Sequence, residues 1–435
     1  MVIEKESNSY LVLFALWLLV FSASSQIMIM APMLPQIGQQ LDIPETVLGT
    51  IVSAYALMVG LFALVIGPIS DKVGRRRVLL AGSGFMTVAL ALHSVAYDYP
   101  TLLAVRALAG VAGGVLSGSA VSYVGDYFPY ERRGWANGWI MSSTALGQIL
   151  GVPLGTLLAE DYGFRVPFLI FAATMAATFL LIWQFVPQPN VQRSEGRLSV
   201  GGALSNYRAL LRRQEVAAAA FAFCLMFISL ALYVIYLPTW LTTTLGATPK
   251  QIASLFFVGG IANVLTGPLA GRLSDSVGRK GLILTSCLGL SVVMLLTTFV
   301  VRNFWMAYPI FFFTMVLVAA RMSPFQALLS SLVTGAQRGT LMSLAVSLGQ
   351  VGFAVGGAVA GLTYTQYGYT SNTVAAAAAV LLMALLVWRF LPEPRREMPL
   401  QEGVSNEDFE LTLGESVGLP ACVEHTPVKA AGSSR

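Results

Sequence analysis

Gly67-Pro-Ile-Ser-Asp-Lys-Val-Gly-Arg-Arg-Arg77 recurs in the second half of the chain as Gly271-Arg-Leu-Ser-Asp-Ser-Val-Gly-Arg-Lys280. Glycine, serine, aspartate, valine, glycine and arginine fall at the same spacings in both copies. Each copy lies in a short polar gap between two long apolar runs. A polar loop duplicated in this way indicates two similar membrane-embedded halves.

The composition excludes an ordinary water-soluble protein. Of 435 residues, 56% are hydrophobic and 11% are charged, whereas a soluble domain has about 25% charged residues. The mean hydropathy is +0.72, and so much apolar surface needs lipid as its solvent. The net charge of +5 does not indicate nucleic acid, because the basic residues lie in short gaps between apolar runs.

Enzyme chemistry has no candidate residues in this sequence. A membrane enzyme would need a metal-binding histidine pair, an aspartate pair or a serine with its base, and only His93 and His425 are histidines. No phosphate-binding loop occurs. The cysteines Cys224, Cys287 and Cys422 have no spacing typical of disulfides or metal sites. We therefore expect no enzyme activity, no cofactor and no metal.

Twelve apolar runs reach the length of about 20 residues that a membrane span needs. The first run continues past signal-peptide length without a cleavage site, so we interpret it as a retained span. The predicted spans are 11–34, 46–70, 78–97, 101–125, 137–159 and 166–186, then 216–242, 250–271, 281–301, 306–333, 339–363 and 371–391. The predicted parts are an N-terminus (1–10), two six-helix bundles (11–186 and 216–391), a connector (187–215) and a disordered tail (392–435).

Lysine and arginine are distributed very unequally between the two ends of these spans. Only Arg165, Lys250 and Arg302 fall on one side, whereas most of the other basic residues fall on the side that holds both termini. Basic loops remain in the cytoplasm. The sequence therefore predicts that both termini, the connector and the tail are cytoplasmic.

The segment Gly67–Arg77 resembles the signature loop of the major facilitator superfamily, and its weaker copy is the expected partner loop. The resemblance extends over residues 11–391. It implies an all-α integral membrane protein with twelve helices in two pseudo-symmetric six-helix bundles, and it implies secondary transport. It says nothing about the substrate.

In each loop the glycines allow a tight turn, and the charged residues have two possible roles. They form a clasp that opens and closes on the cytoplasmic side, which is the interpretation we favour, or they simply anchor the loop. The gating residues predicted from the two copies are Gly67, Asp71, Gly74, Arg75 and Arg76, and Gly271, Asp275, Gly278 and Arg279.

The fifth predicted span contains a ridge of small residues, namely Gly147, Gly151 and Gly155 with Pro153. Glycines four residues apart let helices approach closely, and a proline loosens the helix. The pattern resembles the motif of antiporter members of the superfamily, especially the drug and metabolite efflux group, although the proline falls one place later. Two interpretations of this ridge remain open, plain helix packing and a role in antiport, and the two are compatible. Span eleven repeats the ridge with Gly352, Gly356, Gly357 and Gly361.

The loop between spans four and five carries Asp126, Glu131, Arg132 and Arg133. We interpret these residues as a salt-bridge cluster at the gate. A solvated loop without an energetic role is the alternative, because exposed ion pairs contribute only about 0–1 kcal/mol.

Two arginines lie inside predicted spans, Arg106 in span four and Arg321 in span ten. An arginine at a helix centre costs about 2.5–3.5 kcal/mol on insertion scales, so neither side chain should face lipid. Arg106 resembles the family's conserved arginine in that helix, and in the family spans one, four, seven and ten line the cavity. For both arginines, a structural role and substrate contact remain open.

No Asp or Glu lies well inside a predicted span, so a cationic substrate would lack a partner. We expect a neutral or anionic solute, with any proton coupling through Asp126, Arg106 or His93. Further cavity candidates are the uncharged polar residues of the spans, although such residues more often bond helices together. They are Ser24, Ser25, Gln26, Gln148, Tyr233, Tyr236 and Gln326.

These patterns predict a monomeric secondary transporter of a bacterial inner membrane. It would move a small neutral or anionic solute by alternating access, and the resemblance favours efflux coupled to protons. A facilitative or uptake permease for a metabolite, ion or metal complex is one alternative. A transporter-like scaffold or sensor is another. The expected partners are the solute, protons and the lipid bilayer, without nucleic acid.

Overall fold

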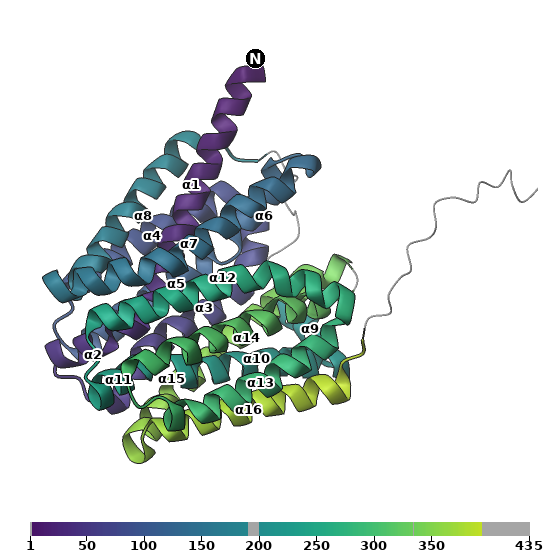
Figure 1. Ribbon diagram of the computed structural model, residues 1–435. Coiled ribbons are helices and arrows are strands. Elements are labelled where there is room, and N and C mark those ends of the chain that lie inside the picture. Colours follow the sequence, from purple (N-terminus) through teal and green to yellow (C-terminus); the bar gives the residue numbers. More distant parts are fainter. Residues whose placement is uncertain (1, 190–199, 334, 394–435) are drawn as a thin grey trace, which may run out of the picture. The chain divides into compact units, whose positions relative to one another are not determined.

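The structure is a computed structural model that describes residues 2–189, 200–333 and 335–393. All regular elements in these ranges are helices, as predicted (Figure 1). The tail from 394 onwards, which the sequence predicts to be disordered, and part of the connector lie outside the described residues.

The first half of the chain contains eight α-helices and one short 3-10 helix within the described residues. They are α1 (Val2–Met28), α2 (Met30–Gln40), α3 (Glu45–Val73), α4 (Arg75–Ala91), η1 (Leu92–Val95), α5 (Tyr99–Leu116), α6 (Ser119–Tyr127), α7 (Tyr130–Tyr162) and α8 (Arg165–Phe185).

Within the described residues, the second half contains a connector helix and seven further α-helices. Its helices are α9 (Val200–Leu211), α10 (Gln214–Val234), α11 (Leu237–Leu245), α12 (Pro249–Val277), α13 (Arg279–Val300), α14 (Phe304–Ser331), α15 (Gly335–Tyr367) and α16 (Tyr369–Phe390). Twelve of the described helical segments are long and apolar enough to cross a membrane. The predicted number of spans is therefore confirmed.

Two spans are broken at corresponding places, which the sequence analysis did not predict. Span one changes from α1 to α2 after Met28, and span seven changes from α10 to α11 after Val234. Pro32 and Pro238 each lie four residues beyond these ends. Because proline has no N–H, neither can bond the carbonyl four residues earlier, and the helix is interrupted there.

The duplicated loops form matching one-residue turns. Gly74 separates α3 from α4 with φ 104°, and Gly278 separates α12 from α13 with φ 110°. Residues with a side chain avoid this positive φ range, so glycine is required at both positions. The repeat seen in the sequence is thus a repeat of backbone geometry.

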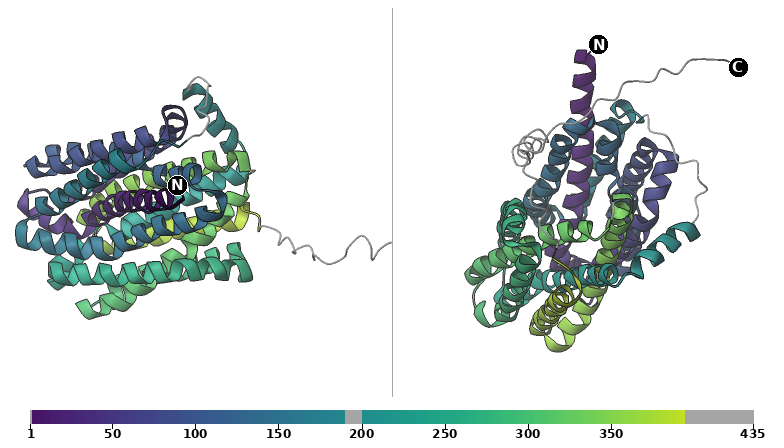
Figure 2. Two further views of the ribbon diagram at one scale, coloured as in Figure 1. Left: turned by 90° about the horizontal axis from the view of Figure 1, so that it is seen from above. Right: turned by 90° about the vertical axis from the view of Figure 1, so that its right-hand side faces the viewer.

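The two sets of six spans meet along two pairs of helices. Helix α3 packs against α15, and α7 packs against α12. We call these pairs the α3–α15 seam and the α7–α12 seam. Figure 1 and the left view of Figure 2 both show α12 running beside α7 at the boundary between the blue first half and the green second half.

The connector contains helix α9, which contacts α10 and α15. The Tyr207 hydroxyl of α9 also donates to the Leu64 carbonyl of α3 at 2.9 Å. Pro68, four residues after Leu64, has no N–H with which to bond that carbonyl. Burial raises the pKa of Tyr207, so its hydroxyl stays protonated and available as this donor.

Candidate transport site

Arg106 is the centre of a fully buried polar cluster in the first half. Its Nη1 donates to Gln26 Oε1 at 3.1 Å, and Gln26 Nε2 donates to the Tyr55 hydroxyl at 3.0 Å. The Arg106 guanidinium carbon lies 4.6 Å from the centre of the Tyr55 ring. The cluster joins α5, α1 and α3. The face of the Tyr55 ring attracts the positively charged guanidinium group of Arg106.

His93 lies beside this cluster and is fully buried. Its ring stacks on Phe168 at 4.1 Å, and Phe168 in turn lies 6.0 Å from the Arg106 guanidinium. Nδ1 lies 2.9 Å from the Ala89 carbonyl and therefore carries the hydrogen. Nε2 is then the unprotonated nitrogen, and it has no partner among the described residues. Protonation would place a second buried cation near Arg106.

Arg321 is the buried arginine of the second half, and it does not lie at the repeat position of Arg106. Its Nη2 donates to the Met226 carbonyl at 3.4 Å, and the Cys287 thiol lies within hydrogen-bonding reach. Nε and Nη1 have no partner among the described residues. Arg321 thus joins α14 to α10 and α13 while keeping free hydrogen-bond donors.

Both arginines are 0% exposed, so neither side chain reaches the lipid. Each is packed among helices of its own half. The partners of Arg106 are the side chains of Gln26 and Tyr55, whereas Arg321 has a backbone carbonyl and a thiol. The two sites are therefore chemically different, and their third helices do not correspond, because Arg106 contacts α3 and Arg321 contacts α13.

The two tyrosine candidates have separate roles in the structure. The Tyr233 hydroxyl bonds Thr297 at 3.0 Å inside the second half. The Tyr236 hydroxyl crosses to the first half, where it donates to the Glu45 carbonyl at 2.6 Å and accepts from the Gly49 N–H at 2.8 Å. Tyr236 therefore joins the two halves, and Tyr233 does not.

The α3–α15 seam is closed near Tyr236 by direct contact between backbones. A Cβ atom added at Gly49 would overlap the Gly357 carbonyl oxygen, and one added at Gly361 would overlap the Thr46 carbonyl oxygen. Nearby, the Ser53 hydroxyl donates to the Ala354 carbonyl at 2.6 Å. Only residues without a side chain allow these helices to approach so closely. We call this region the outer seam.

The other cavity candidates lie apart from the arginines. Gln148 lies on the α7–α12 seam, where its carbonyl oxygen is 3.3 Å from a Cβ added at Gly260. Gln326 is exposed on α14. The structure therefore does not bring the predicted cavity residues together into one pocket in this conformation.

The glycine ridge of α7 packs against α1. Cβ atoms added at Gly147 and Gly151 would lie 3.1 Å and 2.7 Å from the Ser25 hydroxyl oxygen, and one at Gly155 would overlap Ile29. Pro153 lies inside the same helix. Helix packing accounts for these contacts, while the antiport role suggested by the pattern remains a prediction.

The loop at the basic end of the first half is held by an ion pair. Arg75 Nε lies 2.6 Å from Asp126 Oδ2, and Arg75 Nη1 donates to Ser70 at 3.0 Å. The pair joins α4 to α6 inside one half rather than across the two halves. Arg133 Nε donates to the Phe128 carbonyl at 3.1 Å. The side chain of Asp71 lies outside the described residues.

The second loop has a weaker ion pair. Arg279 Nη2 lies 3.5 Å from Asp275 Oδ1, and the Asp275 side chain is 68% exposed. A Cβ added at Gly271 would lie 3.2 Å from the Ser323 hydroxyl oxygen, whereas one at Gly67 would meet no described atom within 4 Å. An exposed ion pair such as Arg279–Asp275 contributes little to the free energy of unfolding.

Each loop is also capped by a side chain that the sequence analysis missed. Gln188 Oε1 accepts from the Arg76 N–H at 3.2 Å, and the Glu393 carboxylate accepts from the N–H groups of Arg279 and Lys280 at 2.8 and 3.0 Å. The caps satisfy the free N–H groups at the starts of α4 and α13. The signal was present as Pro187-Gln-Pro189 and Pro392-Glu-Pro394, which end the two halves.

The charged cap should stabilise the protein more than the neutral cap. Glu393 accepts two hydrogen bonds at a helix N-terminus, where negative charge is favoured. We therefore expect Glu393→Ala to lower the free energy of unfolding by about 1 kcal/mol and Gln188→Ala to lower it less. Thermal unfolding of the purified variants measures this order, and equal midpoints for both variants and the wild type would contradict it.

Twelve spans in two repeated sets, with buried arginines and closely packed seams, define a multi-pass membrane protein built from two similar halves. The Major Facilitator Superfamily model matches residues 16–246 and 219–429. The chain therefore belongs to the major facilitator superfamily, a family of transporters rather than enzymes.

Comparison with individual proteins agrees with this family. The multidrug resistance protein MdtG of Proteus mirabilis (strain HI4320) is 27% identical over 404 residues, which cover 88% of this chain and 97% of the relative. The uncharacterized MFS-type transporter YceJ of Bacillus subtilis (strain 168) is 24% identical over 383 residues, covering 86% and 95%. The crystal structure of a D-xylose-proton symporter has the same fold, with a TM-score of 0.73 at 17% identity and coverage of 89% and 98%.

Proposed function

We propose that this chain exports a small neutral or anionic solute by alternating access, driven by the entry of protons. Membership of the superfamily supports secondary transport, and the relationship to multidrug resistance proteins supports the outward direction. We further propose that it acts as a monomer in a bacterial inner membrane with both termini in the cytoplasm. The unequal distribution of basic residues supports this orientation.

The observation that carries the alternating-access proposal is the state of the two seams. Backbone contact closes the outer seam at Gly49, Gly357 and Gly361. Toward the basic end, a Cβ added at Gly67 on α3 or at Gly267 on α12 would meet no described atom within 4 Å. In the proposed orientation, the halves are in backbone contact outside, and the space beside these two inner glycines is open. A solute would therefore enter from the cytoplasm.

Buried charge supports the proposed substrate class. Among the residues whose side chains are described, Arg106 and Arg321 are buried, and no Asp or Glu is. A cation entering these bundles would find no buried carboxylate, whereas an anion or a hydrogen-bond acceptor could use the free donors of Arg321. For proton coupling, the candidates are Asp126, Arg106 and His93.

The test is transport by purified protein in lipid vesicles, with and without a proton gradient. We expect gradient-dependent movement of uncharged or anionic solutes, and we expect Arg321→Ala to reduce it strongly. A strong preference for a permanent cation such as ethidium would contradict the substrate class. Rates that do not depend on the gradient would contradict proton coupling and favour a facilitative permease. No transport of any solute class would favour a scaffold or sensor.

A further inference from the structure

The space between α10 and α14 in the second half holds Arg321. The main packing partners of α14 are α12 and α13, and those of α10 are α15 and α16. Side chains rather than backbones therefore fill the space between α10 and α14. Arg321 crosses this space from α14 to the Met226 carbonyl of α10, and its side chain is fully buried.

Arg321 keeps one complete hydrogen-bonding edge of its guanidinium free. Nη2 carries two hydrogens, and the Met226 carbonyl takes one of them at 3.4 Å. The other hydrogen of Nη2 lies parallel to that of Nε on one edge of the group, or to one of Nη1 on the other edge. Neither Nε nor Nη1 has a partner among the described residues. Two parallel N–H groups therefore remain, and the Cys287 thiol within reach is a weak acceptor.

The positive charge of Arg321 has no negative partner in the part of the chain that the structure describes. Arginine stays protonated in proteins, and Arg321 is the one charged side chain that is buried in the described part of the second half. No Asp or Glu with a described side chain is buried. A buried charge without a partner is costly. The site therefore lacks one negative charge, and a dianion would bring one too many.

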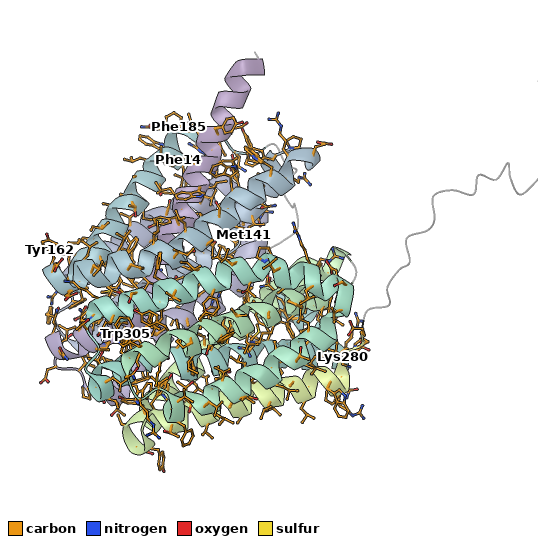
Figure 3. The ribbon with its side chains drawn as sticks, viewed as in Figure 1. Phe14, Met141, Tyr162, Phe185, Lys280 and Trp305 are labelled. Atoms are coloured by element: carbon orange, nitrogen blue, oxygen red, sulfur yellow. The ribbon has the colours of Figure 1, made fainter. Side chains whose placement is uncertain are left out.

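Apolar rings cover Arg321 on the side that faces the basic end. Phe223 lies three residues before the carbonyl that Arg321 binds, Phe325 lies one turn after Arg321, and the two buried rings stack at 5.8 Å. Because α10 runs away from the connector and α14 runs back, both rings lie on the same side of the arginine. Figure 3 shows this direction, with Lys280 at the basic end and Trp305, near the start of α14, away from it. A solute that arrives from the basic end would displace these rings with its own apolar part.

We propose that Arg321 binds the carboxylate of a monoanionic solute whose remainder is apolar. Two parallel N–H groups match the two oxygens of a carboxylate, which is planar and carries a single charge. A phosphate monoester carries about 1.5–2 negative charges, and a halide has a single centre that does not match the pair. The role of this site in export rests on the proposed function, and it narrows the substrate class to apolar monocarboxylates.

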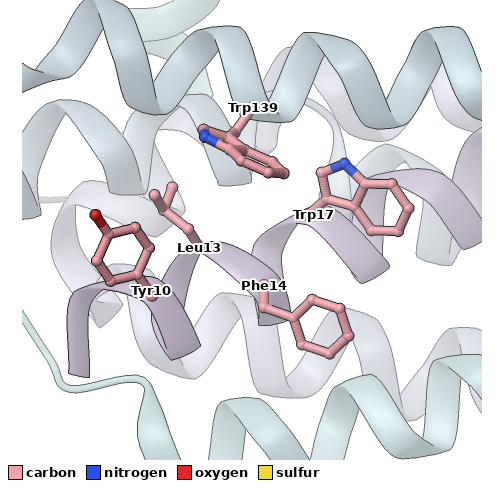
Figure 4. A pocket seen from close by; sticks show the side chains of 5 residues that line it. All are labelled: Tyr10, Leu13, Phe14, Trp17 and Trp139. Atoms are coloured by element: carbon pink, nitrogen blue, oxygen red, sulfur yellow. The ribbon is translucent and has the colours of Figure 1, made fainter. Parts of the chain in front are cut away.

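The pocket between α1 and α7 does not offer the same chemistry. It has a volume of about 340 Å³ and is lined by Tyr10, Leu13, Phe14, Trp17 and Trp139 (Figure 4). None of these side chains is charged, so a carboxylate that entered the pocket would lose its hydration without a compensating partner.

The test is the binding of benzoate to the purified full-length protein at pH 7, measured by isothermal titration calorimetry. Benzoate has an ionised carboxylate on an apolar ring, and benzamide is its uncharged counterpart. We expect saturable binding of benzoate and about tenfold or more weaker binding of benzamide, because hydrogen bonds between charged groups are the stronger ones.

Variants of the arginine give the second part of the test. Arg321→Gln should abolish benzoate binding, and Arg321→Lys, which has a single nitrogen, should weaken it about tenfold. Arg302→Ala is the matched control, because it removes an exposed arginine of the same half. Its dissociation constant for benzoate should equal that of the wild type.

Several results would overturn the proposal. Absence of saturable benzoate binding, or equal affinity for benzoate and benzamide, would do so in the wild type without any variant having to fold. Wild-type affinity in an Arg321→Gln variant with an intact unfolding transition would do the same. If sodium chloride displaces benzoate as strongly as sodium acetate does, the site accepts any small anion and the carboxylate assignment is wrong.

Transport separates this site from the proposed function. Saturable benzoate binding without export of any solute would contradict the proposed function and leave the carboxylate site standing. Proton-driven export of uncharged solutes without benzoate binding would reject the carboxylate site alone.

Discussion

Gly49→Ala should reduce transport about tenfold or more. The added methyl group would overlap the Gly357 carbonyl and press on the Tyr236 ring, so the outer seam could not close. Overpacking costs about 1–3 kcal/mol, which is about a 5- to 150-fold shift between two states. The measurement is the initial rate of solute movement in vesicles, together with labelling of Ala354→Cys by a membrane-impermeant maleimide in a background without the native cysteines.

The control substitution makes the same change where space is available. Gly281 lies in helix α13, is exposed, and meets no described atom within 4 Å. Gly281→Ala should therefore transport at the wild-type rate. In the Gly49→Ala variant, the outer seam stays open and exposes position 354. The cysteine placed there should therefore react with more maleimide. Wild-type transport by Gly49→Ala would show that closure does not depend on this backbone contact.

Arg106→Ala should have the second large effect. The change removes the donor to Gln26 Oε1 and the cation above Tyr55, and it leaves a buried amide oxygen unsatisfied. Hydrogen bonds to charged groups contribute about 1.5–3 kcal/mol, so a loss of about 10- to 150-fold is expected if the cluster acts in transport. The measurement is kcat and KM for the transported solute, with the unfolding midpoint of each variant.

Two further variants separate the roles of this arginine. Arg302→Ala removes an exposed arginine at a helix connection and should leave transport unchanged. Arg106→Lys keeps the charge but has a single nitrogen and cannot reproduce the planar guanidinium over Tyr55. It should recover transport only in part. A lower unfolding midpoint with unchanged kcat and KM would instead indicate that Arg106 is purely structural.

The sequence predicted the elements whose signals are local. Apolar length identifies spans regardless of partners, so the twelve spans were found, and the duplicated glycines identified the turns at Gly74 and Gly278. The helix breaks after Met28 and Val234 were missed although Pro32 and Pro238 were visible. Proline is tolerated inside membrane helices, as at Pro153 of α7, so its presence alone does not locate a break.

Contacts between distant segments could not be predicted in the same way. Tyr236 was a cavity candidate, yet it bonds the backbone at Glu45 and Gly49, because hydroxyl groups in membrane bundles find whichever carbonyl lies near them. Tyr55, the ring under Arg106, carries no motif of its own. Gln188 and Glu393 cap helices that start far away in sequence. Only three-dimensional packing reveals such pairs.

The claim on which the account depends is that the two halves open alternately at opposite ends. Distances between spin labels in lipid vesicles test it most directly. One pair is Asp42→Cys, in the connection after α2, with Thr244→Cys, near the end of α11, and the other is Gly134→Cys on α7 with Val277→Cys on α12. As pH and solute are varied, the account predicts that the outer distance lengthens whenever the inner distance shortens. Two distances that stay constant, or that always change in the same direction, would contradict it.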